Sequence, residues 1–344
     1  MIKRLLQLWH QFPSRQLALI IAAFVTVPNT SALSKPLDFG VAGVPRDLAS
    51  KRNYDQLFRT LTQNGITEFF PTFQYQEVPR PKTFGFEKDF SAPCRADSSA
   101  FKALRNTSMK LIIPAEIVYP NPKSIKEGST TDSPLAEIIA CAGIENISGI
   151  TNYDEAAFHG ISIDSVRRFY NHAKSVAPKI PVLMVHGPII TDRPAFRSSR
   201  KRSRYLDDVI AFSAYADIVG FDVYPIPIVV SRVATPLSNG NDTTPDKAVV
   251  EYLTWLNSAI PNKPKLMVLQ GFSYTDMYEA SFLKANVSKE LRDIVSPPNA
   301  QEINMMVNQA KQNGVSKIIW WGQAALKTSK QAPWPDILRM GQKY

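Results

Sequence analysis

Eight short apolar runs recur along the chain after residue 37, and polar stretches with helical spacing separate them. The runs 110–117 and 265–272 are apolar at nearly every position, which is typical of strands buried on both faces of a parallel sheet. This pattern predicts strands at 38–43, 67–73, 110–117, 148–155, 181–186, 217–224, 265–272 and 317–322.

Helices are expected between these strands. Apolar residues at roughly helical spacing in 48–61 precede Gly65, a residue type that commonly ends helices. Asn299 and Glu302 have the spacing of a capping box, which predicts a helix that runs to Gly314. Strand–helix units repeated in this way predict a single (β/α)8 barrel over 35–344, with a doubly wound open sheet as the alternative. No glycine-rich phosphate loop follows the first predicted strand, which argues against nucleotide binding.

The first 34 residues have a different pattern. Their only charged side chains are Lys3, Arg4 and Arg15, and an uncharged apolar run at 17–27 precedes small residues. A basic start, a short apolar core and a small-residue exit are typical of a secretory signal peptide. The apolar run is shorter than the ~20 residues of a membrane span. We expect a secreted or periplasmic protein, and an uncleaved N-terminal membrane anchor is the alternative.

Composition supports a globular body. The chain has 344 residues, 44% hydrophobic, and a formal net charge of +10. This composition excludes a disordered tail, and two cysteines are too few for an iron–sulfur cluster or a multi-cysteine zinc site. In an oxidising compartment Cys94 and Cys141 could form a disulfide. Two unpaired buried thiols are the alternative.

Polar and aromatic residues gather where the predicted strands end. In a barrel such residues share one mouth, which the long loops 74–97 and 225–246 would wall in, and active sites form there. A buried polar group costs free energy unless it is paired, so these residues predict a functional pocket. They are Glu116, Asn152, Asp154, Glu155, His186, Asp222, Tyr224, Gln270, Phe272, Trp320 and Trp321.

Three segments that contain these residues are 152–155, 217–225 and 265–270. Their sequences and their order along the chain resemble the (β/α)8-barrel glycoside hydrolases of clan A. The resemblance implies that Glu155 is the acid/base glutamate and that a strand-eight tryptophan, Trp320 or Trp321, stacks on sugar. Retaining members carry a nucleophilic glutamate at the end of strand seven, where this chain has Gln270. A neutral amide cannot form the glycosyl-enzyme intermediate. The enzyme is then inverting, or its nucleophile lies elsewhere, or the protein binds glycans without cleaving them.

Glycosidic cleavage needs one carboxylic acid and one opposing carboxylate. Crowded carboxylates raise one pKa, which suits a general acid. We predict Glu155 as the acid, with Asp222 or Glu116 as base or nucleophile; salt bridges, a helix cap or backbone hydrogen bonds are the structural alternatives. The residues expected to bind substrate are Asp154, Asn152, His186, Tyr224, Gln270, Phe272, Trp320 and Trp321.

Basic residues cluster after the fifth predicted strand. The functional interpretation is attraction of an acidic polysaccharide, and the alternative is a solvated helix start. No nucleic-acid motif accompanies the cluster, so no nucleic acid partner is expected. His159 and His186 lack metal-ligand spacing, and we expect neither metal nor cofactor. The cluster comprises Arg193, Arg197, Arg200, Lys201, Arg202 and Arg204.

The sequence therefore predicts an exported glycoside hydrolase that acts on a polysaccharide by two-carboxylate chemistry. A catalytically inactive glycan-binding or scaffold protein on the same barrel is the alternative function.

Overall fold

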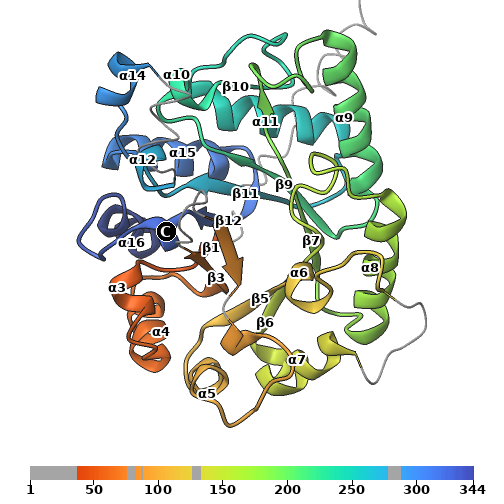
Figure 1. The fold of residues 1–344 in the computed structure, drawn as a ribbon, viewed down its shortest axis with the longest axis vertical. Helices are drawn as coiled ribbons and strands as arrows, with labels where there is room; N and C mark the ends of the chain where they lie inside the picture. The colour runs from red at the N-terminus through yellow and green to blue at the C-terminus, as the bar shows by residue number, and fades with distance from the viewer. Residues whose placement is uncertain (1–36, 76–82, 87, 126–132, 278–287) are drawn as a thin grey trace, which may run out of the picture. The chain divides into compact units, whose positions relative to one another are not determined.

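The computed structural model describes residues 37–75, 83–86, 88–125, 133–277 and 288–344. Its centre is a closed barrel of parallel strands in the order β1-β12-β11-β9-β7-β6-β5-β2 (Figure 1). All eight predicted strands are confirmed, and the open sheet is excluded. The barrel strands are β1 (Asp38–Ala42), β2 (Glu68–Phe70), β5 (Lys110–Pro114), β6 (Ile147–Thr151), β7 (Val182–His186), β9 (Ile218–Val223), β11 (Lys265–Gln270) and β12 (Val315–Trp321).

Helices surround the barrel, because each strand before β12 is followed by a helix that returns the chain to the start of the next strand, and β12 is followed by α16. Asn299 and Glu302 form the predicted capping box at the start of α15. The main helices are α4 (Tyr54–Gln63), α5 (Ser99–Asn106), α7 (Pro134–Ala142), α8 (Ile163–Val176), α9 (Ser199–Ser213), α11 (Pro245–Ala259), α15 (Ala300–Gln312) and α16 (Trp334–Lys343).

Shorter helices occupy the connections. The first part of the predicted helix at 48–61 belongs to the separate helix α3 (Arg46–Ala49), because Arg52 has a φ of 50° and Asn53 caps α4. The other short helices are α6 (Ala115–Val118), α10 (Ile228–Ser231), α12 (Tyr274–Met277), α14 (Lys289–Asp293), η1 (Lys88–Phe90), η2 (Ile144–Asn146) and η3 (Gln323–Ala325). No helix among the described residues is long and apolar enough to cross a membrane, and the predicted leader lies outside them.

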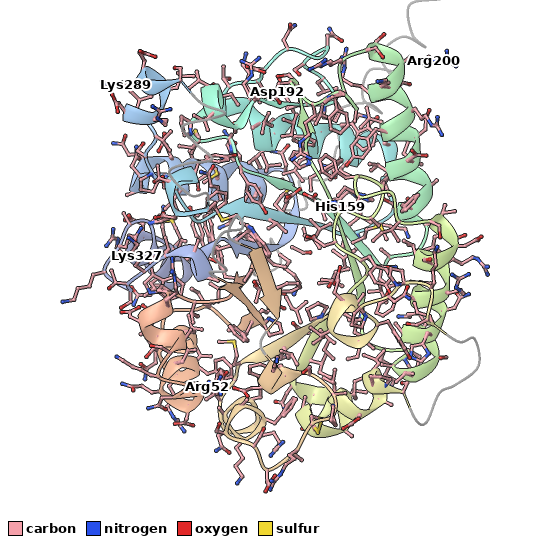
Figure 2. The ribbon with its side chains drawn as sticks, in the orientation of Figure 1. Arg52, His159, Asp192, Arg200, Lys289 and Lys327 are labelled. Atoms are coloured by element: carbon pink, nitrogen blue, oxygen red, sulfur yellow. A yellow bond between two sulfur atoms is a disulfide. The ribbon has the colours of Figure 1, made fainter. Side chains whose placement is uncertain are left out.

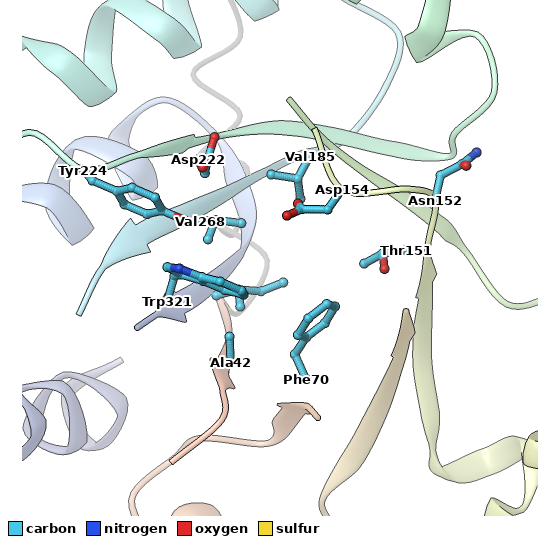
Figure 3. Close-up of a pocket in the computed structure, with 11 residues that line it drawn as sticks. Ala42, Phe70, Thr151, Asn152, Asp154, Val185, Asp222, Tyr224, Val268 and Trp321 are labelled. Atoms are coloured by element: carbon cyan, nitrogen blue, oxygen red, sulfur yellow. The ribbon is translucent and has the colours of Figure 1, made fainter. Parts of the chain in front are cut away.

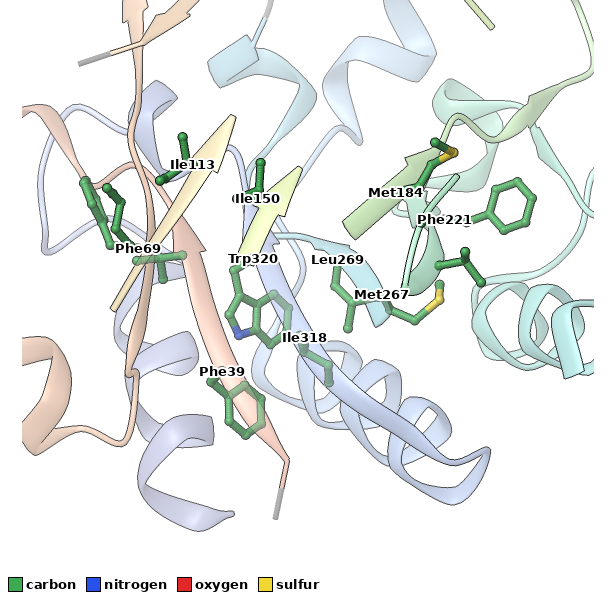
Figure 4. Packing of buried hydrophobic residues seen from close by; sticks show 14 of the residues in the cluster. Phe39, Phe69, Ile113, Ile150, Met184, Phe221, Met267, Leu269, Ile318 and Trp320 are labelled. Atoms are coloured by element: carbon green, nitrogen blue, oxygen red, sulfur yellow. The ribbon is translucent and has the colours of Figure 1, made fainter. Parts of the chain in front are cut away.

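Two cores hold the fold. The larger core lies between the strands and the helices, and Figure 4 shows members such as Phe39, Phe221 and Trp320 packed there. The smaller one contains Phe70, Val185 and other apolar residues of the strands. Alternation along a strand separates the two sets, because successive side chains point to opposite faces. On β12, Trp320 is fully buried in the larger core, while Trp321 packs against the smaller one.

The two long loops follow β2 and β9, as predicted, and each contributes to a two-stranded antiparallel sheet. The first forms a hairpin of β3 (Thr72–Tyr75) and β4 (Thr83–Phe86). The second contributes β10 (Val233–Ala234), which pairs with β8 (Ile189–Ile190) from the loop after β7. Cys94 and Cys141 form a disulfide that joins the first loop to α7. The alternative of two free thiols is therefore wrong.

Candidate functional site

A pocket opens at the carboxyl ends of the barrel strands. Its empty volume is about 440 Å³, including the space at its open mouth. Seven of the eight barrel strands, or the turns directly after them, contribute side chains to its lining, and Figure 3 shows these side chains around the pocket. This is the end of the barrel where strand-end side chains can act together on one ligand. The lining residues are Ala42, Phe70, Thr151, Asn152, Asp154, Val185, Asp222, Tyr224, Val268, Ile319 and Trp321.

The pocket wall is largely apolar and aromatic. Phe70 and Trp321 meet edge to face, with 6.4 Å between their ring centroids. Tyr224 packs edge to face on the buried Phe272 at 5.2 Å, so its ring is held in place. Flat apolar faces with a polar tip suit a sugar ring, which has both apolar and hydroxyl-bearing surfaces.

Two carboxyl groups, Asp154 and Asp222, line this pocket. Burial raises the pKa of Asp222 well above its usual range, and the charge of Glu155 and a hydrogen bond with that residue raise it further. The pKa of Asp154 is also raised, because surrounding protein atoms desolvate its carboxyl and because Glu155 and Glu116 carry like charges. Asp154 is nevertheless exposed in the open pocket, where water favours its charged form, so it is the easier of the two to ionise.

Glu155 lies behind the pocket and is not among its lining residues. Its backbone has a φ of 43°, a left-handed conformation that typically costs about 1–3 kcal/mol in a non-glycine residue. Its carboxyl lies against Gly187, where an added Cβ would come within 2.9 Å of the carboxyl carbon. Any larger residue at position 187 would therefore displace this group.

His159 holds Glu155 in its charged form. Its Nε2 lies 3.0 Å from Glu155 Oε2. Burial alone would raise the pKa of Glu155, but hydrogen bonds from His159 and Asp222 and the charges of His159 and Arg193 lower it overall. The lowered pKa of Glu155 and the raised pKa of Asp222 favour a pair in which the proton lies on Asp222.

Glu116 and Asn152 position the segment that carries Asp154. Glu116 Oε1 accepts a 2.7 Å hydrogen bond from the Asp154 backbone N–H, and burial raises the pKa of Glu116. Asn152 Nδ2 donates to the backbone carbonyls of Val166 and Tyr215, and its side chain points away from the pocket in Figure 3. Both side chains are therefore engaged with backbone, and only Asn152 contributes to the pocket wall.

Gln270 is fully buried at the end of β11, outside the pocket lining. Its Nε2 donates to Ile226 O at 2.6 Å and Phe272 O at 3.0 Å, and its Oε1 accepts from Ile226 N at 2.9 Å. The expectation that Gln270 lines the pocket is therefore corrected. Its amide fastens the start of the loop after β9, because it satisfies both the donor and the acceptor of one backbone residue.

Three other predicted binding residues are also buried away from the pocket. His186 Nε2 is 2.9 Å from Ser213 Oγ, and burial lowers the pKa of His186 to about 3. Phe272 packs beneath Tyr224, and Trp320 belongs to the core between barrel and helices. None of the three lines this pocket, although His186 Nδ1 and Trp320 Nε1 are buried without a hydrogen-bond partner among the described residues.

Of the residues selected from sequence, the structure brings five to the pocket: Asp154, Asn152, Asp222, Tyr224 and Trp321. Sequence reasoning missed Phe70, although Phe70 is the last residue of the second strand and strand ends surround the mouth of a barrel. Its side chain points to the same face of the strand as that of Glu68. Sequence reasoning also missed Gly187, whose signal is its place directly after a predicted strand. Within the described residues, no group of His, Cys, Asp and Glu side chains is arranged to hold a metal ion.

Comparison with known proteins adds information on the fold. No family model matches the chain, and no curated protein matches it. A candidate α-L-fucosidase from Bacteroides thetaiotaomicron is 11% identical, with a TM-score of 0.54 and coverage of 90% of this chain and 94% of that one. The endo-1,4-β-mannanase from Rhizomucor miehei is 10% identical, with a TM-score of 0.50 and coverage of 89% and 94%. The chain therefore shares a barrel fold with glycoside hydrolases.

Proposed function

We propose that this protein is a glycoside hydrolase that cleaves a poly- or oligosaccharide with Asp222 as general acid and Asp154 as base or nucleophile. The observation that carries the proposal is the pair of carboxyl groups that line one aromatic pocket while a third carboxylate, Glu155, holds a proton on one of them. Hydrolysis of a glycoside needs a protonated acid and an ionised partner around one bond.

The acid role moves from Glu155, where sequence reasoning placed it, to Asp222. A general acid must carry its proton at working pH and must reach the leaving oxygen. Asp222 meets both needs, because it lines the pocket and its pKa is raised by burial and by Glu155. Glu155 acts as a positioning residue whose charge keeps that proton in place.

The partner role falls to Asp154. It is exposed in the pocket and lacks the hydrogen bond that holds the proton on Asp222, so it ionises first as pH rises. Activity should then follow a bell-shaped pH profile. The acidic limb reports ionisation of Asp154 and the basic limb reports loss of the Asp222 proton. Both limbs should lie above the usual carboxyl range near pH 4.

Trp321 and Tyr224 would hold the sugar. Trp321 offers a partly exposed ring at the pocket wall, opposite the side from which Asp222 approaches (Figure 3). Stacking of a sugar on such a ring gives binding energy without demanding one particular hydroxyl pattern. Gln270 stands where clan A enzymes carry their nucleophile, and the proposed chemistry does not use that position.

Export remains part of the proposal. The disulfide Cys94–Cys141 supports it, because disulfides persist mainly in oxidising compartments outside the cytosol. The basic and apolar pattern of residues 1–34 supports a signal peptide or an N-terminal anchor.

The test measures reducing-end release from a panel that contains mannan, fucosylated glycans and acidic and neutral polysaccharides. Asp222→Asn should reduce the rate about 10²–10⁴-fold, the usual contribution of a general acid. Asp164→Asn, the same change in an exposed ion pair on α8, is the matched control and should leave the rate within about twofold.

Two results would contradict the proposal. Full activity of Asp222→Asn would remove the acid assignment. No release from any glycan by the wild-type protein, with glycan binding retained, would instead support the inactive glycan-binding alternative. Anomer analysis of the first product would then decide between inversion and retention for an active enzyme.

A further inference from the structure

A second pocket lies beside the first, between the turn that follows Glu155 and the start of α9. Its empty volume, including the open space at its mouth, is about 730 Å³. Two separate parts of the chain build it, one after β6 and the other from residue 193 to 208. The residues that matter for its chemistry are Phe158, Arg193, Lys201, Arg204, Tyr205 and Asp208.

The pocket is strongly basic. Arg193, Lys201 and Arg204 line it, against the single carboxylate of Asp208. Within the described ranges, none of the three cations has a carboxylate partner within 4.0 Å. Cations that line a pocket and outnumber its carboxylates create a positive potential that attracts an anion.

Two of these cations are held in place. The Arg193 guanidinium lies over the Phe158 ring, 4.6 Å from its centroid. Lys201 Nζ donates to the carbonyl of Pro194 at 2.8 Å, which keeps its ammonium at the rim. Side chains held in this way lose less conformational entropy when they bind an anion.

The floor of the second pocket is aromatic. Phe196 is buried and stacks on Phe158, with 5.8 Å between ring centroids. Tyr205 meets Phe196 edge to face at 5.1 Å. These rings pack on one another and on Arg193, so they form a rigid base for cations that suit a negatively charged ligand, and acidic sugars carry such a charge.

Gly187 and Glu155 connect this pocket to the proposed acid, Asp222. Tyr205 Oη donates to the carbonyl of Gly187 at 2.5 Å, and Gly187 contacts the Glu155 carboxyl from its other side. The Phe158 ring meets His159 edge to face at 5.2 Å, and His159 pairs with Glu155. The basic pocket therefore lies close to the proposed catalytic groups, with Gly187, His159 and Glu155 between them.

From this arrangement we infer that the second pocket is a binding subsite for an acidic sugar residue of the substrate, held by Arg193, Lys201 and Arg204 over the Phe158–Phe196 floor. The subsite rests on the proposed function for its catalytic purpose, but its anion binding stands on its own. A carboxylate or a sulfate would supply the same negative charge. An arginine side chain also offers paired N–H donors that match the two oxygens of a carboxylate.

The test compares two double variants that remove the same charge. Lys201→Gln with Arg204→Gln removes two cations from the pocket. Arg197→Gln with Arg200→Gln removes two cations of the same cluster that do not line it, and Figure 2 shows Arg200 near the outer end of α9. Calorimetry would measure binding of an oligogalacturonate, its carboxyl-reduced neutral counterpart and a sulfated dextran oligosaccharide, at low and moderate salt. Circular dichroism would check that both variants fold.

We expect the wild-type protein to bind the oligogalacturonate at least about tenfold more tightly than the reduced form, and the pocket variant to lose that preference. The affinity of the control variant for the oligogalacturonate should fall by less than about threefold, because its substitutions weaken only the long-range attraction that salt screens. Loss of sulfated dextran binding alone would identify sulfate as the anionic group. Equal losses in both variants, or no preference of the wild-type protein for either anionic glycan, would overturn the subsite.

Binding is scored separately from reducing-end release. A protein that binds acidic glycans in this pocket but cleaves none would keep the subsite and refute the hydrolase. A protein that cleaves glycans without regard to their charge, and binds acidic and neutral glycans equally, would keep the hydrolase and refute the subsite.

Discussion

Placing a glutamate at position 270 should damage the protein rather than equip it with a nucleophile. Gln270→Glu changes the amide whose nitrogen donates to Ile226 O and Phe272 O. A carboxylate has no proton to donate, so it would face both carbonyl oxygens with a negative charge. The bond that Gln270 accepts from Ile226 N would survive. We therefore expect a stability defect and no gain of catalysis.

The magnitude follows from these contacts. Two donated hydrogen bonds contribute about 1 kcal/mol each, and a protonated glutamate could restore one of them. At pH 7, protonation of the new glutamate costs about 1.4 kcal/mol for each unit by which its pKa in the folded state exceeds its pKa in the unfolded state. If burial raises the folded pKa by about two units, this cost is about 3 kcal/mol. The expected loss in free energy of unfolding is then about 4 kcal/mol at pH 7. Because the folded state favours the protonated glutamate, the loss should shrink to about 1 kcal/mol near pH 4.5, close to the unfolded pKa.

Chemical denaturation at pH 4.5 and pH 7 measures this difference. Gln301→Glu is the matched control, since it makes the same change at an exposed position in the first turn of α15. It should change stability by no more than about 0.5 kcal/mol. A Gln270→Glu protein as stable as wild type at pH 7, or one that forms a covalent glycosyl adduct, would refute this account of the site.

Three further predictions follow from contacts in and around the site. Replacing both Cys94 and Cys141 by serine should lower the free energy of unfolding by about 4 kcal/mol, because the disulfide closes a 47-residue separation; denaturation with and without reductant checks this, and equal stability contradicts it. Trp321→Ala should weaken glycan binding at least about tenfold in calorimetry without loss of the folded circular dichroism spectrum, and unchanged affinity would exclude stacking. His159→Gln should cost at most about 1 kcal/mol, because the pair with Glu155 is partly exposed. Since that pair raises the pKa of His159, the cost should be full below about pH 6.5 and vanish as pH rises through the raised value; a cost that grows with pH would contradict it.

Sequence alone predicts the barrel because the same pattern, an apolar strand-type run followed by a helix-forming stretch, recurs eight times along the chain. Strand-type runs such as 110–117 and 265–272 are apolar at nearly every position, and each is separated from the next by a helix-forming stretch. The capping box at Asn299 was equally readable, since it depends only on local spacing. The break between α3 and α4 was not, because it depends on the backbone of Arg52.

The site was harder to predict, because sequence places residues at strand ends but does not orient them there. Asp154 and Glu155 are neighbours, yet only Asp154 lines the pocket, and the backbone of Glu155 is left-handed at that point. The place of Gln270 at a strand end and the cost of burying an unpaired amide predict a pocket residue, but its amide is bound to a loop 44 residues away in the chain. Contacts of that kind depend on the closed barrel and have no local signal.

The small sheet of β8 and β10 joins two loops that leave different barrel strands. Val233 and Ala234 pair with Ile190 and Ile189, and Tyr252 of α11 links the same strands through bonds to Ile189 N and Ala234 O. Segments tied in this way open together rather than one at a time. Hydrogen exchange of these backbone amides should therefore report one shared opening free energy, so the two loops behave as a single cooperative unit beside the barrel mouth.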